Sequence, residues 1–89
     1  MYGTMRHNYL RDYHRGVFDG MLLTGKLNAH LEEVDRTANE MFDLLMKQYA
    51  ARESVTEELK ARNQIEWAQR MNSIRDRAME VINSNLIYT

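Results

Sequence analysis

Residues 27–53 read LNAHLEEVDRTANEMFDLLMKQYAARE, and the spacing of their apolar side chains predicts one long helix. The apolar residues recur at alternating intervals of four and three, as on the buried face of a helix in a bundle. Asn28 stands where a side chain can cap the helix start, and we place the helix at about residues 28–53. Its stripe comprises Leu27, Leu31, Val34, Ala38, Met41 and Leu45, with Phe42 and Tyr49 at its edge.

A second helical stripe follows in the last third of the chain. Ser54 with Glu57 fits a capping box, and Thr56 fits a simple cap, so we expect a helix over about residues 55–83. No Gly or Pro interrupts the chain after residue 25. Two long helices joined by a short loop pack as an antiparallel hairpin. The second stripe comprises Trp67, Met71, Ile74, Ala78, Val81 and Ile82.

The N-terminal segment, about residues 3–24, forms a shorter helix or a pair of helices. Met5, Tyr9, Tyr13 and Val17 are four residues apart, which is a helical spacing, and Gly16 offers a point of division. Gly25 is expected just beyond a helix end, in the left-handed conformation that closes a last turn.

Length and composition set the class. With 89 residues and a small core, the chain is one all-α domain over residues 1–89, and a helical homodimer would cover the apolar surface that remains. It has no cysteine, no signal peptide and no run long enough to span a bilayer, so we expect a cytoplasmic protein without a membrane partner.

Charge is unevenly distributed along the chain. The first 26 residues hold four basic against two acidic side chains, and residues 27–53 hold six acidic against three basic. The basic set is a candidate surface for duplex DNA, and part of the acidic set is a candidate surface for a protein partner. The DNA candidates are Arg6, Arg11, Arg15 and Lys26, and the acidic candidates are Glu32, Glu33, Glu40 and Asp43.

Residues 18–34, FDGMLLTGKLNAHLEEV, have the outline of a helix-turn-helix motif. The helix that would enter the major groove opens with Glu32, Glu33 and Asp35, which DNA phosphates would repel. We therefore interpret the stretch as a tight corner between packed helices.

Asn72 and Arg75 project from the apolar face of the last helix, beside Trp67 and Met71. A guanidinium group in an apolar face needs a carboxylate or carbonyl partner. One interpretation is an internal ion pair with the acidic helix that sets the register of the hairpin. The other is an interface with another chain, since Arg with Trp and Met is typical of binding hot spots.

Signals for catalysis are absent. The sequence has no glycine-rich phosphate loop, no nucleophile motif and no metal-binding pattern among His7, His14 and His30. We expect no enzymatic activity, no metal or other cofactor, and no small-molecule substrate.

Three stretches carry a family resemblance: LLTGKL (residues 22–27), VTEELK (residues 55–60) and WAQRMNSIR (residues 67–75). With them the chain resembles the TnpV family of small transposon-encoded proteins, found on mobile elements of Firmicutes, from about Tyr9 to Tyr88. Members often carry an additional N-terminal segment that this sequence does not include. The resemblance supplies no catalytic residue.

The resemblance implies that the gene for this protein lies on mobile DNA, with a recombinase encoded nearby. In that setting we expect an accessory protein that binds DNA or the recombination complex, as an excisionase-like factor or a regulator. The alternative is a protein-binding module that inhibits a host nuclease or defence system.

Overall fold

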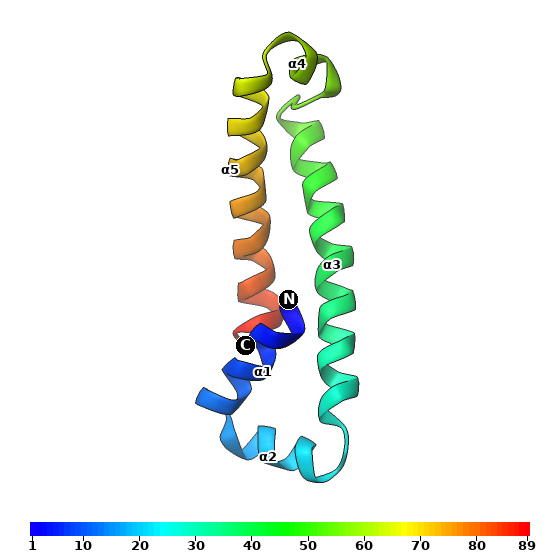
Figure 1. Ribbon diagram of the computed structural model, residues 1–89, viewed down its shortest axis with the longest axis vertical. Coiled ribbons are helices and arrows are strands. Elements are labelled where there is room, and N and C mark those ends of the chain that lie inside the picture. Colours follow the sequence, from blue (N-terminus) through cyan, green and yellow to red (C-terminus); the bar gives the residue numbers. More distant parts are fainter.

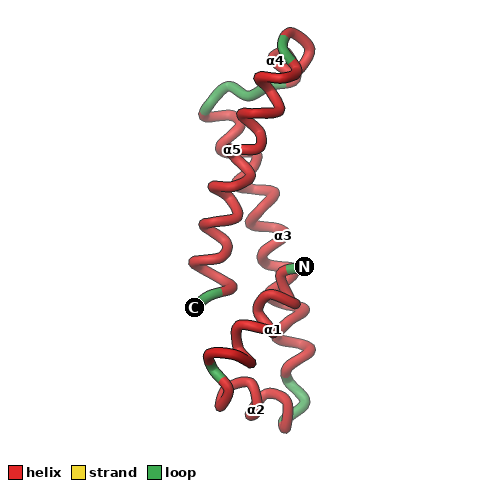
Figure 2. The backbone as a smooth tube through the Cα atoms, turned by 60° about the vertical axis from the view of Figure 1, so that its left-hand side comes forward, coloured by secondary structure: helices red, strands yellow, loops and turns green.

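The computed structural model describes all 89 residues as a helical rod of 55 × 19 × 17 Å without a β-strand (Figure 1). The two long helices α3 and α5 run antiparallel, as the hairpin prediction required. Helix α1 packs against one half of this hairpin, and α2 closes the same end (Figures 1 and 2). The elements are α1 (Tyr2–Tyr13), α2 (Arg15–Leu23), α3 (Leu27–Arg52), α4 (Glu57–Arg62), α5 (Gln64–Ile82) and the π-helical turn η1 (Asn83–Ile87).

Helix α3 begins one residue earlier than expected and is not capped by Asn28. Gly25 adopts the predicted left-handed conformation, with φ +72°, and the N–H of Lys26 donates to the carbonyl of Met21 at 2.9 Å. This turn leads the chain directly into the helix, so Lys26 occupies the cap position without a side-chain hydrogen bond.

The prediction of one helix over residues 55–83 is wrong at Asn63. Thr56 caps the short α4 by accepting the N–H of Leu59 at 3.2 Å. Asn63 then leaves the helical conformation, with φ −148° and ψ 89°, and its Oδ1 accepts the N–H of Glu66 to start α5. Asparagine favours this arrangement because its side chain competes with the backbone for helical hydrogen bonds. Ser54, the other predicted cap, has φ +57° and caps nothing.

The N-terminal segment divides at His14 and not at Gly16. The break turns α2 relative to α1, so a single stripe does not continue across it. Tyr13 and Val17, expected on the apolar face, are exposed, whereas Tyr2, Leu10 and Phe18 are buried.

The core is thin, with 12 of the 89 residues buried, and it runs along the rod as three clusters. Both predicted stripes supply it. The buried members are Leu27, Val34 and Ala38 of α3 and Ile74, Ala78 and Ile82 of α5. The clusters centre on Leu10, Phe18 and Leu27 at the α2 end, on Tyr2, Val34, Ala38, Ile82 and Ile87 in the middle, and on Val55, Leu59 and Ile74 at the α4 end.

No helix has the combination of length and apolar character that crossing a bilayer requires.

Candidate binding surfaces

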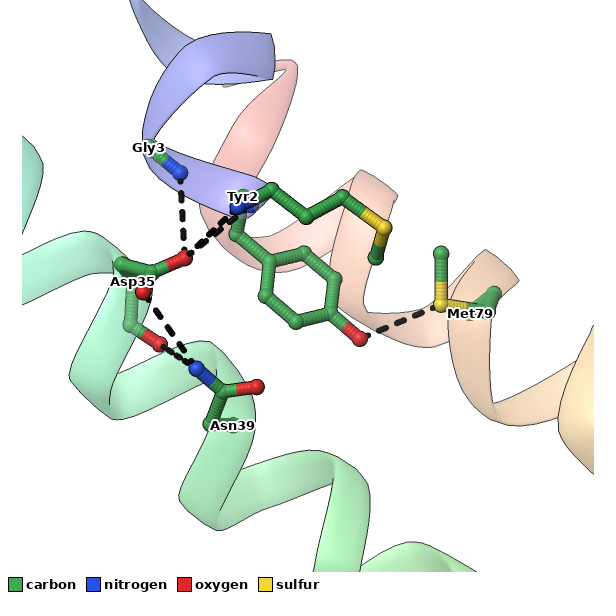
Figure 3. A network of polar contacts seen from close by, with 6 residues as sticks. Tyr2, Gly3, Asp35, Asn39 and Met79 are labelled. Atoms are coloured by element: carbon green, nitrogen blue, oxygen red, sulfur yellow. Dashed lines mark hydrogen bonds and ion pairs between the residues drawn. The ribbon is translucent and has the colours of Figure 1, made fainter.

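A polar network fixes the start of α1 to α3 (Figure 3). Asp35 Oδ1 accepts the N–H of Tyr2 at 3.0 Å and that of Gly3 at 3.3 Å, and lies 3.5 Å from the amine of Met1. The pKa of Asp35 is held below its usual range, chiefly by the N–H of Gly3 and also by the amine of Met1 and the N–H of Tyr2. A carboxylate on α3 thus caps the N-terminus of another helix.

Tyr2 is the aromatic anchor of this junction. Its ring is buried, and its hydroxyl donates to the sulfur of Met79 on α5 at 3.2 Å. Burial raises the pKa of Tyr2, while the charge of Arg75 acts in the opposite direction. The sequence pattern did not indicate the contact between Tyr2 and Asp35, because that contact spans 33 positions and leaves no local signal.

Arg6, a DNA candidate, is engaged inside the fold. Its guanidinium donates to the carbonyl of Ile87 at 2.9 Å and to that of Thr89 at 3.2 Å, and its Nε lies 3.4 Å from His30 Nε2. Burial lowers the pKa of His30, and the charge of Arg6 lowers it further. Arg6 therefore ties α1 to the C-terminal turn and to α3.

The other basic candidates are exposed and belong to one end of the rod, where α1 ends, α2 begins and α3 begins (Figure 1). Two of them have acidic neighbours. Arg11 pairs with Asp12 at 3.1 Å, and Arg15 pairs with Asp19 at 3.2 Å. Lys26 has no ion pair.

The acidic candidates lie on the solvent-exposed side of α3. Glu32, Glu33, Glu40 and Asp43 are all exposed, and none forms an ion pair within the chain. Glu33 and Glu40 are two helical turns apart, so they present their charges along the same side of the rod.

Asn72 and Arg75 do not form the expected internal ion pair. Both are exposed, and neither makes a hydrogen bond or salt bridge within the chain. Because both residues lie at the edge of the apolar face, their side chains reach solvent and need no hydrogen-bond partner within the chain. Trp67 and Met71, in contrast, are half-buried and pack beside Ile74.

Arg75 instead borders a groove on one face of the hairpin. At the α1 end, the groove is lined by Tyr2 and Phe42, and towards α4 by Trp67 and Met71. Met46 lines both parts and joins them. The complete lining adds Met1, Asp35, Asn39, Arg75 and Met79 at the α1 end and Lys47, Ala50, Val55, Thr56 and Glu57 at the α4 end.

The three histidines lie in different places on the rod, and His7 lines a shallow hollow with Glu32 and Asp35. No group of three or more His, Asp or Glu side chains is placed to hold a metal ion. The geometry therefore offers binding faces and a groove as its candidate sites.

Comparison with known proteins places the chain in a family. The sequence model described as transposon-encoded protein TnpV matches residues 1–87. The chain belongs to the TnpV family. The match extends the resemblance to Met1 and covers the positions of Tyr2 and Asp35. No curated protein and no solved structure gave a significant match.

Proposed function

We propose that this member of the TnpV family is a non-enzymatic accessory factor of its transposon, and that it binds the recombination complex through the acidic face of α3. The observation that carries the proposal is the contrast between the two charged sets. Four exposed carboxylates on α3 have no partner within the chain, while Arg6, Arg11 and Arg15 all do.

The chemistry favours a basic protein partner. Proteins that act on DNA carry dense Lys and Arg surfaces to neutralise phosphates. A face of α3 that carries four carboxylates and one exposed cation, Arg36, is complementary to such a surface, and complementary charge speeds association and selects the partner. We expect a recombinase encoded by the same element to have a surface of this kind.

Direct binding of duplex DNA is the second candidate function. Arg11, Arg15 and Lys26 are exposed at one end of the rod, where they would contact phosphates. Three cations, two of them beside a carboxylate, form a weak site, so this candidate predicts low affinity and strong salt dependence.

One binding experiment separates the two candidates. The purified protein is titrated against the element's recombinase and, separately, against a fluorescent duplex from the element and an unrelated duplex, at several salt concentrations. The proposal expects binding to the recombinase that weakens with salt, and loss of that binding in the variant E32Q/E33Q/E40Q/D43N. The variant R11Q/R15Q/K26Q serves as the matched control and should bind the recombinase as before.

The opposite pattern would contradict the proposal. Sequence-preferring duplex binding that R11Q/R15Q/K26Q abolishes would establish the DNA candidate in its place. Absence of both interactions at low salt would refute both candidates and favour a module that inhibits a host nuclease or defence system.

A further inference from the structure

We propose that the groove containing Met46 is the interface between two copies of this chain, packed antiparallel about a twofold axis. The proposal concerns a different face from the acidic surface of α3 and does not depend on which partner that surface binds.

The two faces of the hairpin differ in how they are covered. Arg77 lies two positions from Arg75, about 200° around α5, and therefore on the opposite side. There it pairs with Glu53 at 2.6 Å and stacks on Tyr49, joining α5 to the end of α3. No ion pair crosses the groove face, where the side chains of Phe42, Met46 and Met71 are only half-buried.

Helix α1 covers one end of this same face of the hairpin. Tyr2 and Met5 of α1 pack on Val34, Ala38 and Ile82, between the two long helices. The α1 helix covers only the part of the hairpin nearest α2 (Figure 1). The groove begins at the first residues of α1, Met1 and Tyr2. The remaining half lacks a third helix and has a lining suited to one, because Met side chains adapt to an incoming apolar surface.

The exposed area is larger than that of a compact monomer. A chain of 10.6 kDa would expose about 5,500 Å² as a compact fold, against 6178 Å² here. The difference reflects the elongated shape of 55 × 19 × 17 Å, in which part of the hairpin has no third helix packed on it.

The charges of the groove are complementary to themselves. Arg75 lies at the α1 end and Glu57 at the α4 end, and neither has an ion-pair partner within the chain. A twofold axis across the groove midway between Arg75 and Glu57, on the α4 side of Met46, would bring Arg75 of each copy to Glu57 of the other, because the contacts of a twofold interface are reciprocal. If the two copies packed parallel, their α1 helices would collide, because α1 packs on this face of the hairpin in each copy.

Sedimentation equilibrium of the whole chain measures the assembly. We expect a dimer whose dissociation constant rises about tenfold or more in Arg75→Glu and in Glu57→Arg. An equimolar mixture of these two variants should dimerise again, because both cross-interface contacts then join opposite charges. Leu23→Asn on α2, where the side chain is 87 % exposed, and Arg62→Glu on α4 are control variants that should leave the dimer unchanged. Circular dichroism verifies that each variant is folded.

A second measurement uses the absence of cysteine. Near a twofold axis a residue faces its own copy, and Met71 lies between Arg75 and Glu57 along the groove, so Met71→Cys should form a disulfide-linked dimer faster than Leu23→Cys. A chain that stays monomeric at high concentration would overturn the proposal and leave the groove to a different protein. A dimer that resists both charge reversals, or that is lost in Leu23→Asn, would also overturn it.

Discussion

Asp35 on α3 accepts the backbone N–H of Tyr2 at 3.0 Å, and so caps a helix that begins 33 positions earlier in the chain. The same carboxylate oxygen accepts the N–H of Gly3. Neither donor has a partner within α1, because the first N–H groups of a helix have no preceding carbonyl. The junction orients α1 in the hairpin and brings Met1 and Tyr2 to the end of the groove.

Removing the carboxylate should loosen this junction. We expect Asp35→Ala to lower the melting temperature by about 5 °C, because two helical N–H groups lose their acceptor. Thermal denaturation followed by circular dichroism measures the change. Asp76→Ala on the exposed side of α5 is the control, since Asp76 makes no ion pair. Equal melting temperatures for the two variants would show that the cap contributes nothing.

Two glycines should respond in opposite directions to a larger side chain. A Cβ at Gly3 would lie 3.1 Å from the carbonyl oxygen of Leu31, so α1 would have to move away from α3. We expect Gly3→Val to destabilise the fold by about 1 kcal/mol or more. At Gly20 a Cβ meets nothing within 4 Å, and Gly20→Ala should stabilise by about 0.5–1 kcal/mol. Urea denaturation of both variants tests the pair, and a stabilising Gly3→Val would contradict the close packing.

Arg6 should stabilise the C-terminal turn. We expect Arg6→Gln to cost about 1–2 kcal/mol and to speed hydrogen exchange in η1, because the carbonyl of Ile87 loses its charged donor. Arg11→Gln is the matched control, since its exposed pair with Asp12 contributes little. Exchange rates in η1 that are unchanged in Arg6→Gln would contradict this role.

Stability should fall as pH drops below neutrality. The pKa of His30 is lowered in the folded chain, so the unfolded chain takes up a proton first. The contribution of His30 is therefore complete above its ordinary pKa of 6.5 and is lost as pH falls through the folded value. The lowered pKa of Asp35 adds a second loss at more acidic pH, below its ordinary 3.8.

Urea denaturation at a series of pH values measures this dependence. His30→Gln should flatten the decline that begins near pH 6.5, while His14→Gln, at an exposed position, should not. An equally steep decline in His30→Gln would assign it to another group.

Some of the candidate site could be predicted from sequence and some could not. The acidic residues of α3 are exposed as their spacing indicated, because a polar face needs no distant partner. The internal ion pair of Arg75 was a wrong prediction, and the contacts of Arg6 with the C-terminal turn were not foreseen. Both depend on contacts between helices, and Arg6 reaches a carbonyl 81 positions away.

The sequence by itself determined the helical class, the hairpin and the core stripes of α3 and α5. These follow from local periodicity and from the lack of Gly or Pro after residue 25, which act within a few residues of each position. Only the tertiary structure decided the break at Asn63, the capping of α1 by Asp35 and the half-covered groove around Met46. These features depend on which helix ends meet in space, and hydrogen bonds and packing between distant segments set that arrangement.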